Sequence, residues 1–239
     1  MQFRSLIKFI TALLLATLTA TSLPAWATES GDAQRFRQIY EKEWAFRMQE
    51  YPLFASDVGL DEYAGQIGSA SEADETRRYE YWKGIRNELN GISCQRLSRE
   101  DCIDFRIYVK QIDGFLADYE TGAYLIPFTS DWGFYLELAR LPKDTDFSAL
   151  QDYRNYLARL HAMPGLIDQY IGLMRKGIET GFTQPRVILD GRDKPIKAQL
   201  VEQAQDSPFF APFLDLPESV ASGDKAKLLA TAEQVVSAE

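Results

Sequence analysis

The sequence predicts an all-α protein, a multi-helix bundle with short loops and little or no β-structure. Three observations support this prediction. Apolar residues recur at three- and four-residue steps along most of the chain, as on one face of a helix. Apart from residues 186–190, no run of five or more residues alternates between apolar and polar. The composition of the 239 residues, 46% hydrophobic and 26% charged, is that of an ordinary globular domain.

The first half of the chain shows three long helical patterns, over residues 32–50, 71–89 and 101–119. Pro52 ends the first pattern, because a residue before proline avoids the helical conformation. Ser71 and Ser98 are expected to cap the second and third helices, because a serine side chain can accept a hydrogen bond from the first helical turn. A short piece is expected over 54–60.

In the second half, helices are expected over residues 147–160, 164–181 and 193–205, and from 222 or 223 onward. Pro164 is placed in the first turn of a new helix, where proline is tolerated. His161 then lies at the end of the preceding helix. Segments 124–127 and 132–141 fit no single pattern, residues 185–189 form a short piece, and residues 208–217 form a proline-rich connector.

Residues 1–27 have the features of a secretory signal peptide. Arg4 and Lys8 precede an apolar run of about ten residues, and Ala25-Trp26-Ala27 is a typical cleavage site. The run is shorter than the ~20 residues that span a bilayer, so we expect cleavage after Ala27 and no stable membrane anchor afterwards. A periplasmic or secreted location is expected, with residues 28–239 as a single helical domain.

Charge and composition exclude several functions. The formal net charge is −9, which argues against nucleic acid as a partner, because phosphate binding needs a basic face. His161 is the only histidine and there are only two cysteines, so no multi-histidine or zinc-ribbon site can form. Paired acidic residues lie in polar stretches typical of helix starts. We therefore expect no catalytic residue, no metal ligand and no cofactor in this chain.

Cys94 and Cys102 are predicted to form a disulfide. They bracket an expected interhelical loop, between a glycine stop at Gly91 and the start at Ser98. Oxidising compartments outside the cytoplasm preserve such bonds. The alternative is a pair of free thiols, one in each helix.

Two features are candidates for a substrate cleft. Aromatic residues are concentrated at Trp132, Phe134 and Tyr135, and they either line a cleft or pack in the core between helices. Arg186 follows a proline and either binds a carboxylate or forms a structural ion pair. Trp132, Tyr135 and Arg186 are the candidate cleft residues.

Several segments together resemble the N-terminal part of the bacterial family called domain of unknown function 885. The resemblance rests on Trp44 through Pro52 to Gly59, on the helix start at residues 97–101, and on Met163-Pro164-Gly165 with the glycines that follow. Residues 185–189 and 206–213 extend it to the end of the chain.

This resemblance implies a helical fold that forms one side of a cleft and a zinc-dependent hydrolase acting on peptides or small amides. In that family a His-Glu pair followed by Pro-Gly-His holds the metal, in the half after the part matched here. The present sequence contains no His-Glu pair. The resemblance therefore implies an N-terminal piece of a longer peptidase-like protein, inactive alone, with zinc expected only in the full-length protein.

A second interpretation remains open. The last helix carries an apolar stripe and stops without a capping signal, which fits either a truncated helix or a frayed terminus. In the latter case the chain is a complete, non-enzymatic helical protein of the periplasm that binds a peptide or another protein.

Overall fold

The computed structural model describes residues 31–237, and the predicted signal peptide lies outside this range. The all-α prediction is confirmed. Within residues 31–237 no strand forms, and the β-type pairing is an isolated bridge between Phe128 and Gly133. No helix in this range has the length and apolar character needed to cross a lipid bilayer.

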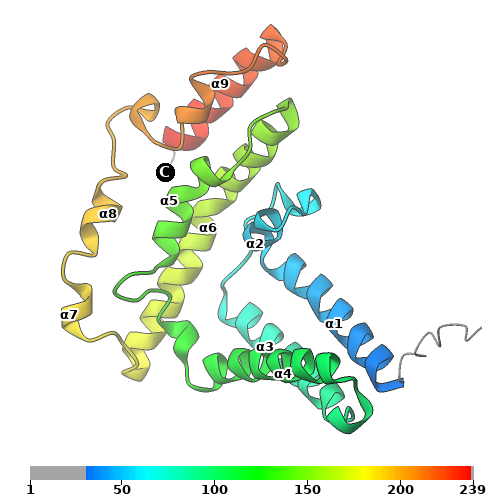
Figure 1. Ribbon diagram of the computed structural model, residues 1–239. Helices are drawn as coiled ribbons and strands as arrows, with labels where there is room; N and C mark the ends of the chain where they lie inside the picture. The colour runs from blue at the N-terminus through cyan, green and yellow to red at the C-terminus, as the bar shows by residue number, and fades with distance from the viewer. Residues whose placement is uncertain (1–30, 238–239) are drawn as a thin grey trace, which may run out of the picture.

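The N-terminal layer consists of α1 (Gly31–Glu50), α3 (Glu72–Leu89) and α4 (Arg99–Glu120), which pack around one core (Figure 1). Ser71 and Ser98 cap α3 and α4 as predicted, each accepting a hydrogen bond from a backbone N–H three residues on. Between α1 and α3 lie α2 (Pro52–Asp57) and the 3₁₀ turn η1 (Asp61–Tyr63). The buried members of this core are Ile39, Trp82, Ile85, Leu89, Ile92, Tyr108 and Ile112.

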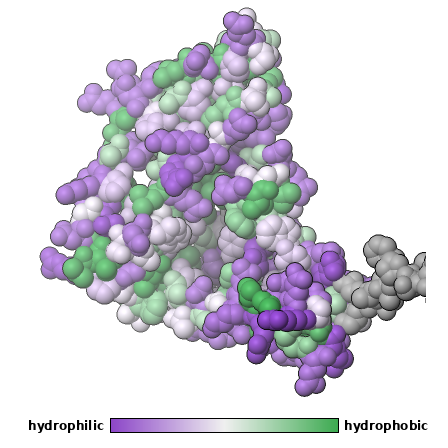
Figure 2. All heavy atoms as spheres, in the orientation of Figure 1, coloured by the Kyte–Doolittle hydropathy of each residue, from purple (hydrophilic) through white to green (hydrophobic). Residues whose placement is uncertain are grey.

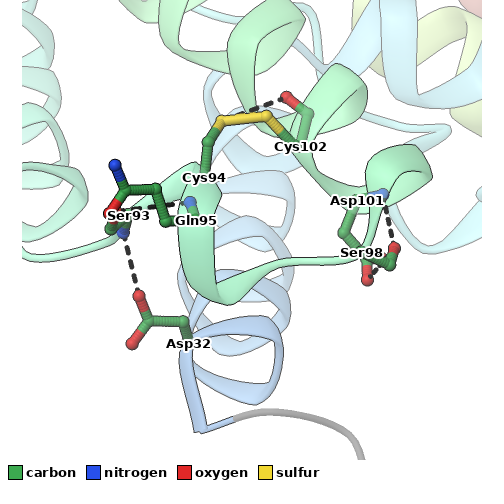
Figure 3. Close-up of a disulfide and its surroundings, with 7 residues drawn as sticks. All are labelled: Asp32, Ser93, Cys94, Gln95, Ser98, Asp101 and Cys102. Carbon is green, nitrogen blue, oxygen red and sulfur yellow. Dashed lines mark hydrogen bonds between the residues drawn. A yellow bond between two sulfur atoms is a disulfide. The ribbon is translucent and has the colours of Figure 1, made fainter.

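The predicted disulfide between Cys94 and Cys102 is present (Figure 3). Cys94 opens the 3₁₀ turn η2 (Cys94–Arg96), and Cys102 lies in the first turn of α4. Asp32 accepts a hydrogen bond of 2.9 Å from the backbone N–H of Ser93, which ties the same loop to the start of α1. The disulfide therefore joins the loop after α3 to the start of α4.

The C-terminal layer is built on α6 (Leu150–Thr180), with α5 (Phe134–Asp144) and α9 (Ser222–Ser237) against it (Figure 1). The 3₁₀ turn η3 (Ala123–Leu125) joins α4 to this layer. Its core is larger and aromatic, and it includes Phe134, Tyr153, Tyr156, Phe210 and Phe213.

Two predicted helices are one. The boundary expected at Pro164 is wrong, because α6 runs through it without interruption. Pro164 and Gly165 lie on the exposed side, while Leu160, Met163 and Leu166 are buried along the other side. An interior proline costs about 3 kcal/mol. The continuous buried stripe outweighs this cost, so His161 lies in mid-helix and is exposed, not at a helix end.

The connection from α6 to α9 contains only short helical pieces. These are α7 (Arg186–Leu189), α8 (Asp193–Lys197), η4 (Ala204–Asp206) and η5 (Ala211–Phe213). The helix predicted over 193–205 therefore ends at Lys197. Its apolar residues Ile196, Leu200 and Val201 are exposed, so no packed face supports a longer helix there.

Candidate functional site

The two layers are joined along α6 by polar contacts. Arg159 is 4% exposed, and its guanidinium donates to the carbonyl of Gln66 at 2.8 Å and to Ser56 Oγ at 2.6 Å. Ten residues further along α6, about three turns, Gln169 Oε1 accepts from the backbone N–H of Ala70 at 2.7 Å. These bonds fix α6 beside the segment that leads from α2 into α3.

A set of polar side chains lies at this seam, and we call it the seam cluster: Tyr51, Glu75, Arg78, Glu137 and Tyr170. They come from the α1–α2 junction, α3, α5 and α6. The Arg78 guanidinium lies over the Tyr51 ring, 5.4 Å from its centroid. The charges of Glu137 and Glu75 raise the pKa of Tyr170 and that of Arg78 lowers it, and Tyr170 in turn acts on the pKa of Tyr51. Figure 2 shows this face of the molecule hollowed between α6 and the α1–α2 side.

Arg78 forms the buried base of the seam cluster. It is 1% exposed and donates to Glu75 Oε1 at 2.6 Å, to Glu50 Oε2 at 3.1 Å and to the carbonyl of Ser69 at 3.1 Å. Its Nε is buried and has no partner among the residues that the structure describes. The hydrogen bond to Glu50 links α3 to α1, the other two lie within α3 and the loop before it, and the charge of Arg78 stays inside the seam.

The two tyrosines of the cluster are neutral hydrogen-bond donors. Burial raises the pKa of Tyr170 to about 12, and the charges of Glu137 and Glu75 act in the same direction. Burial also raises the pKa of Tyr51, against the opposing charge of Arg78. Within residues 31–237 neither hydroxyl forms a hydrogen bond, and Tyr51 keeps 38% of its surface exposed. Both hydroxyls are therefore available to a ligand.

Glu137 supplies the acceptor. It lies in the first turn of α5, and burial raises the pKa of its carboxyl, with Asp57 and Asp144 adding to the effect. A carboxylate with a raised pKa near unpartnered hydroxyls is typical of functional sites. Together, Tyr51, Tyr170 and Glu137 can donate two hydrogen bonds to a bound molecule and accept others from it.

The three residues predicted to line a cleft lie on neighbouring segments, because Gln184 Nε2 donates to the Phe128 carbonyl at 3.0 Å and ties the stretch before α7 to the turn of Trp132. Trp132 is 51% exposed, in the turn closed by the Phe128–Gly133 bridge. The Tyr135 hydroxyl is buried without a partner among the described residues. The Tyr135 ring packs against Gly133, where an added Cβ would lie 2.6 Å from the ring. Arg186 is exposed at the start of α7 and forms no salt bridge within residues 31–237.

The sequence left open whether the aromatic residues line a cleft or pack in the core, and Phe134 has a part in both. It is 7% exposed in the C-terminal core, as the packing interpretation requires, and its ring stacks on Tyr170 with centroids 4.3 Å apart. Tyr135 contacts Phe134 edge-on at 5.8 Å. The aromatic segment thus supports the seam cluster from behind, while Trp132 lies outside it.

The described residues do not fit a zinc ion. No group of three or more histidine, cysteine, aspartate or glutamate side chains in this range is placed to hold a metal. His161 is exposed on α6, and both cysteines are in the disulfide. No hydrolytic step through a metal is therefore assigned to the residues of this chain.

The fold and the seam define the class: an all-α protein of two helical layers with a polar site where they meet. One similar solved structure is that of a protein from Colwellia psychrerythraea described as a lipoprotein. Its TM-score is 0.71 at 17% identity, over 86% of this chain and 38% of that chain. The present chain thus spans well under half the length of that protein. No curated protein matches the chain.

The chain belongs to the family described as bacterial protein of unknown function, DUF885. The family model matches residues 52–239. This range contains four members of the seam cluster, and Tyr51 directly precedes it.

Sequence reasoning missed Glu137 and Tyr170 for different reasons. Tyr170 falls at an apolar position of the helix expected over residues 164–181, and its hydroxyl at the seam leaves no trace in the periodicity. Glu137 lies in a segment that fitted no single pattern. The i, i+3 spacing of Glu75 and Arg78 could have pointed to a polar site on α3, whereas neither Glu137 nor Tyr170 carries such a local signal.

Proposed function

We propose that this chain forms one wall of the substrate cleft of a peptidase-like hydrolase that acts on peptides or related amides. The observation that carries the proposal is the seam cluster, in which the Tyr51 and Tyr170 hydroxyls share the seam with the carboxylate of Glu137, an exposed residue whose pKa is raised. A peptide backbone offers both carbonyl acceptors and N–H donors, so it complements this mixture of donors and acceptor. The cluster lies where two layers meet, a common position for ligand sites.

The hydrolytic groups come from outside this chain in the proposal. The similar structure from Colwellia psychrerythraea is aligned over only 38% of its length. Peptidases of the type that the family resemblance suggests use a metal-activated water and a glutamate base. The residues that the structure describes, 31–237, do not fit that role, so this chain alone is expected to bind substrate without cleaving it.

The location that fits this function is outside the cytoplasm. The signal-peptide features of residues 1–27 and the Cys94–Cys102 disulfide both support export, because disulfides persist in oxidising compartments.

The test is a titration of isotopically labelled chain with blocked tri-alanine, followed by backbone amide shifts. We expect the largest shifts at Tyr51, Glu75, Glu137 and Tyr170 and no cleavage of the peptide. Shifts confined to other surfaces would contradict the proposed site, as would the absence of any shift.

A second arm tests the hydrolase itself. The protein purified from its native cells is incubated with the same peptide, and the products are analysed by mass spectrometry. Cleavage that is lost with a chelator supports a metal-dependent hydrolase. Binding without cleavage by the native protein would overturn the hydrolase proposal and favour the non-enzymatic binding protein.

A further inference from the structure

A second concave site lies away from the seam cluster, between α1 and α4. We call it the α1–α4 groove, and its volume is about 460 Å³. This volume is large enough to take a side chain with several methylene groups. Its main lining residues are Phe36, Arg37, Tyr40, Asp101, Asp104 and Ile107.

The floor of the groove is aromatic and rigid. Phe36 and Tyr40 each contact the ring of Tyr108 edge-on, with centroids 5.7 Å away in both cases. Tyr108 is 6% exposed, and its hydroxyl donates to the fully buried Glu43 at 3.1 Å. The floor is therefore anchored to the core, while Ile107, at 64% exposure, forms an open apolar rim.

The groove carries more negative than positive charge. Asp101 and Asp104 lie one turn apart on α4, and Arg37 is the basic residue of the lining. Arg37 is already engaged in an interaction of its own. Asp101 accepts from the Ser98 hydroxyl at 2.6 Å, whereas Asp104 forms no hydrogen bond or ion pair with another residue in the described range. Asp104 is thus an exposed carboxylate at the edge of an aromatic surface.

This combination complements one kind of ligand. A cation on an apolar stem gains from an aromatic ring below it and from a carboxylate beside it. Tyr40 is 42% exposed and available for the ring contact. A neutral apolar ligand would leave Asp104 unused, and an anion would be repelled.

We propose that the α1–α4 groove binds the basic side chain of a peptide, an arginine or a lysine, with its stem on Tyr40 and Ile107 and its charge at Asp104. The site shares no residue with the seam cluster, and the proposal does not depend on the proposed function.

The experiment measures binding of Nα-acetyl-arginine amide to the full chain by calorimetry. The matched ligand is Nα-acetyl-citrulline amide, which has almost the same shape and no charge. We expect the citrulline compound to bind about tenfold more weakly than the arginine compound. We also expect raised salt to lower the affinity for the arginine compound. Equal affinities for the two compounds, or no binding of either, would overturn the proposal.

Variants locate the site. Asp104→Asn and Tyr40→Leu are each expected to lower the affinity for the arginine compound about fivefold to tenfold. Asp118→Asn, an exposed carboxylate on the same helix outside the groove, is the control and should leave affinity unchanged. All three positions are exposed, so folding is checked by circular dichroism alone. Loss of affinity in Tyr170→Phe but not in Asp104→Asn would place the ligand at the seam and refute this assignment.

Discussion

Glu43 gives the sharpest test of how the N-terminal layer is held together. Its side chain is fully buried and accepts four hydrogen bonds from three elements. Arg47 donates at 2.9 Å and 2.7 Å, Trp82 Nε1 at 2.9 Å and the Tyr108 hydroxyl at 3.1 Å. This one carboxylate therefore links α1, α3 and α4.

The expected loss of unfolding free energy follows from the charge of Arg47, which Glu43 no longer compensates. Replacing Glu43 by leucine leaves the Arg47 guanidinium, which is 8% exposed, without its counter-ion. Breaking a buried pair on one side costs about 3–5 kcal/mol of unfolding free energy. The double variant Glu43→Leu/Arg47→Met removes the charge as well. It should recover about 2 kcal/mol of that loss, with the remainder due to the unpaired Trp82 and Tyr108 donors.

The assay is urea unfolding followed by circular dichroism, analysed by linear extrapolation. Glu41→Leu, on the exposed side of the same helix, is the control and should change stability by less than about 0.5 kcal/mol. A loss below about 1 kcal/mol for Glu43→Leu would refute the reasoning. So would a double variant that is less stable than the single one.

Three further predictions concern α6, the disulfide and acid stability. A Cβ at Gly177 would lie 2.7 Å from a backbone carbonyl oxygen, so Gly177→Ala should destabilise the protein by about 1–3 kcal/mol. A Cβ at Gly172 would meet open space, so Gly172→Ala should stabilise the protein by about 0.5–1 kcal/mol in the same urea assay. Removing both Cys94 and Cys102 should cost about 2–3 kcal/mol, as the chain-entropy model gives for so short a loop; a loss of zero in thermal melts would contradict this. Hydrogen bonds from serine and arginine side chains hold the pKa of Asp74 well below its usual range, so its contribution is present above the unfolded-state pKa and is lost as pH falls below about 4. Asp74→Asn should therefore melt lower at neutral pH and lose less on acidification than the unmodified protein; parallel melting curves at every pH would contradict this.

Much of the fold follows from local sequence signals. The serine caps at Ser71 and Ser98, the stop before Pro52 and the disulfide loop were each read from a few neighbouring residues, and each is present. These features depend on contacts within one turn or one loop. Local chemistry is therefore enough to predict them.

Features that depend on distant partners could not be predicted in this way. Pro164 predicts a helix break by its own chemistry, and only the buried side of α6 shows why the helix continues. Nothing in the residues next to Glu43 and Arg47 indicates burial, yet Trp82 and Tyr108 from other helices bond to Glu43 and make the pair the centre of a buried network. The seam cluster likewise exists only because two layers meet.

The most direct test of the central claim is the affinity of blocked tri-alanine for the Tyr51→Phe/Tyr170→Phe double variant. Each substitution removes one hydroxyl and keeps the ring, and each lost hydrogen bond is worth about 1 kcal/mol. We predict that binding weakens about tenfold or more relative to the unmodified chain, while the control Tyr79→Phe, whose hydroxyl bonds Glu120 on the surface, binds normally. An unchanged affinity in the double variant would contradict the assignment of the seam as the substrate-binding wall.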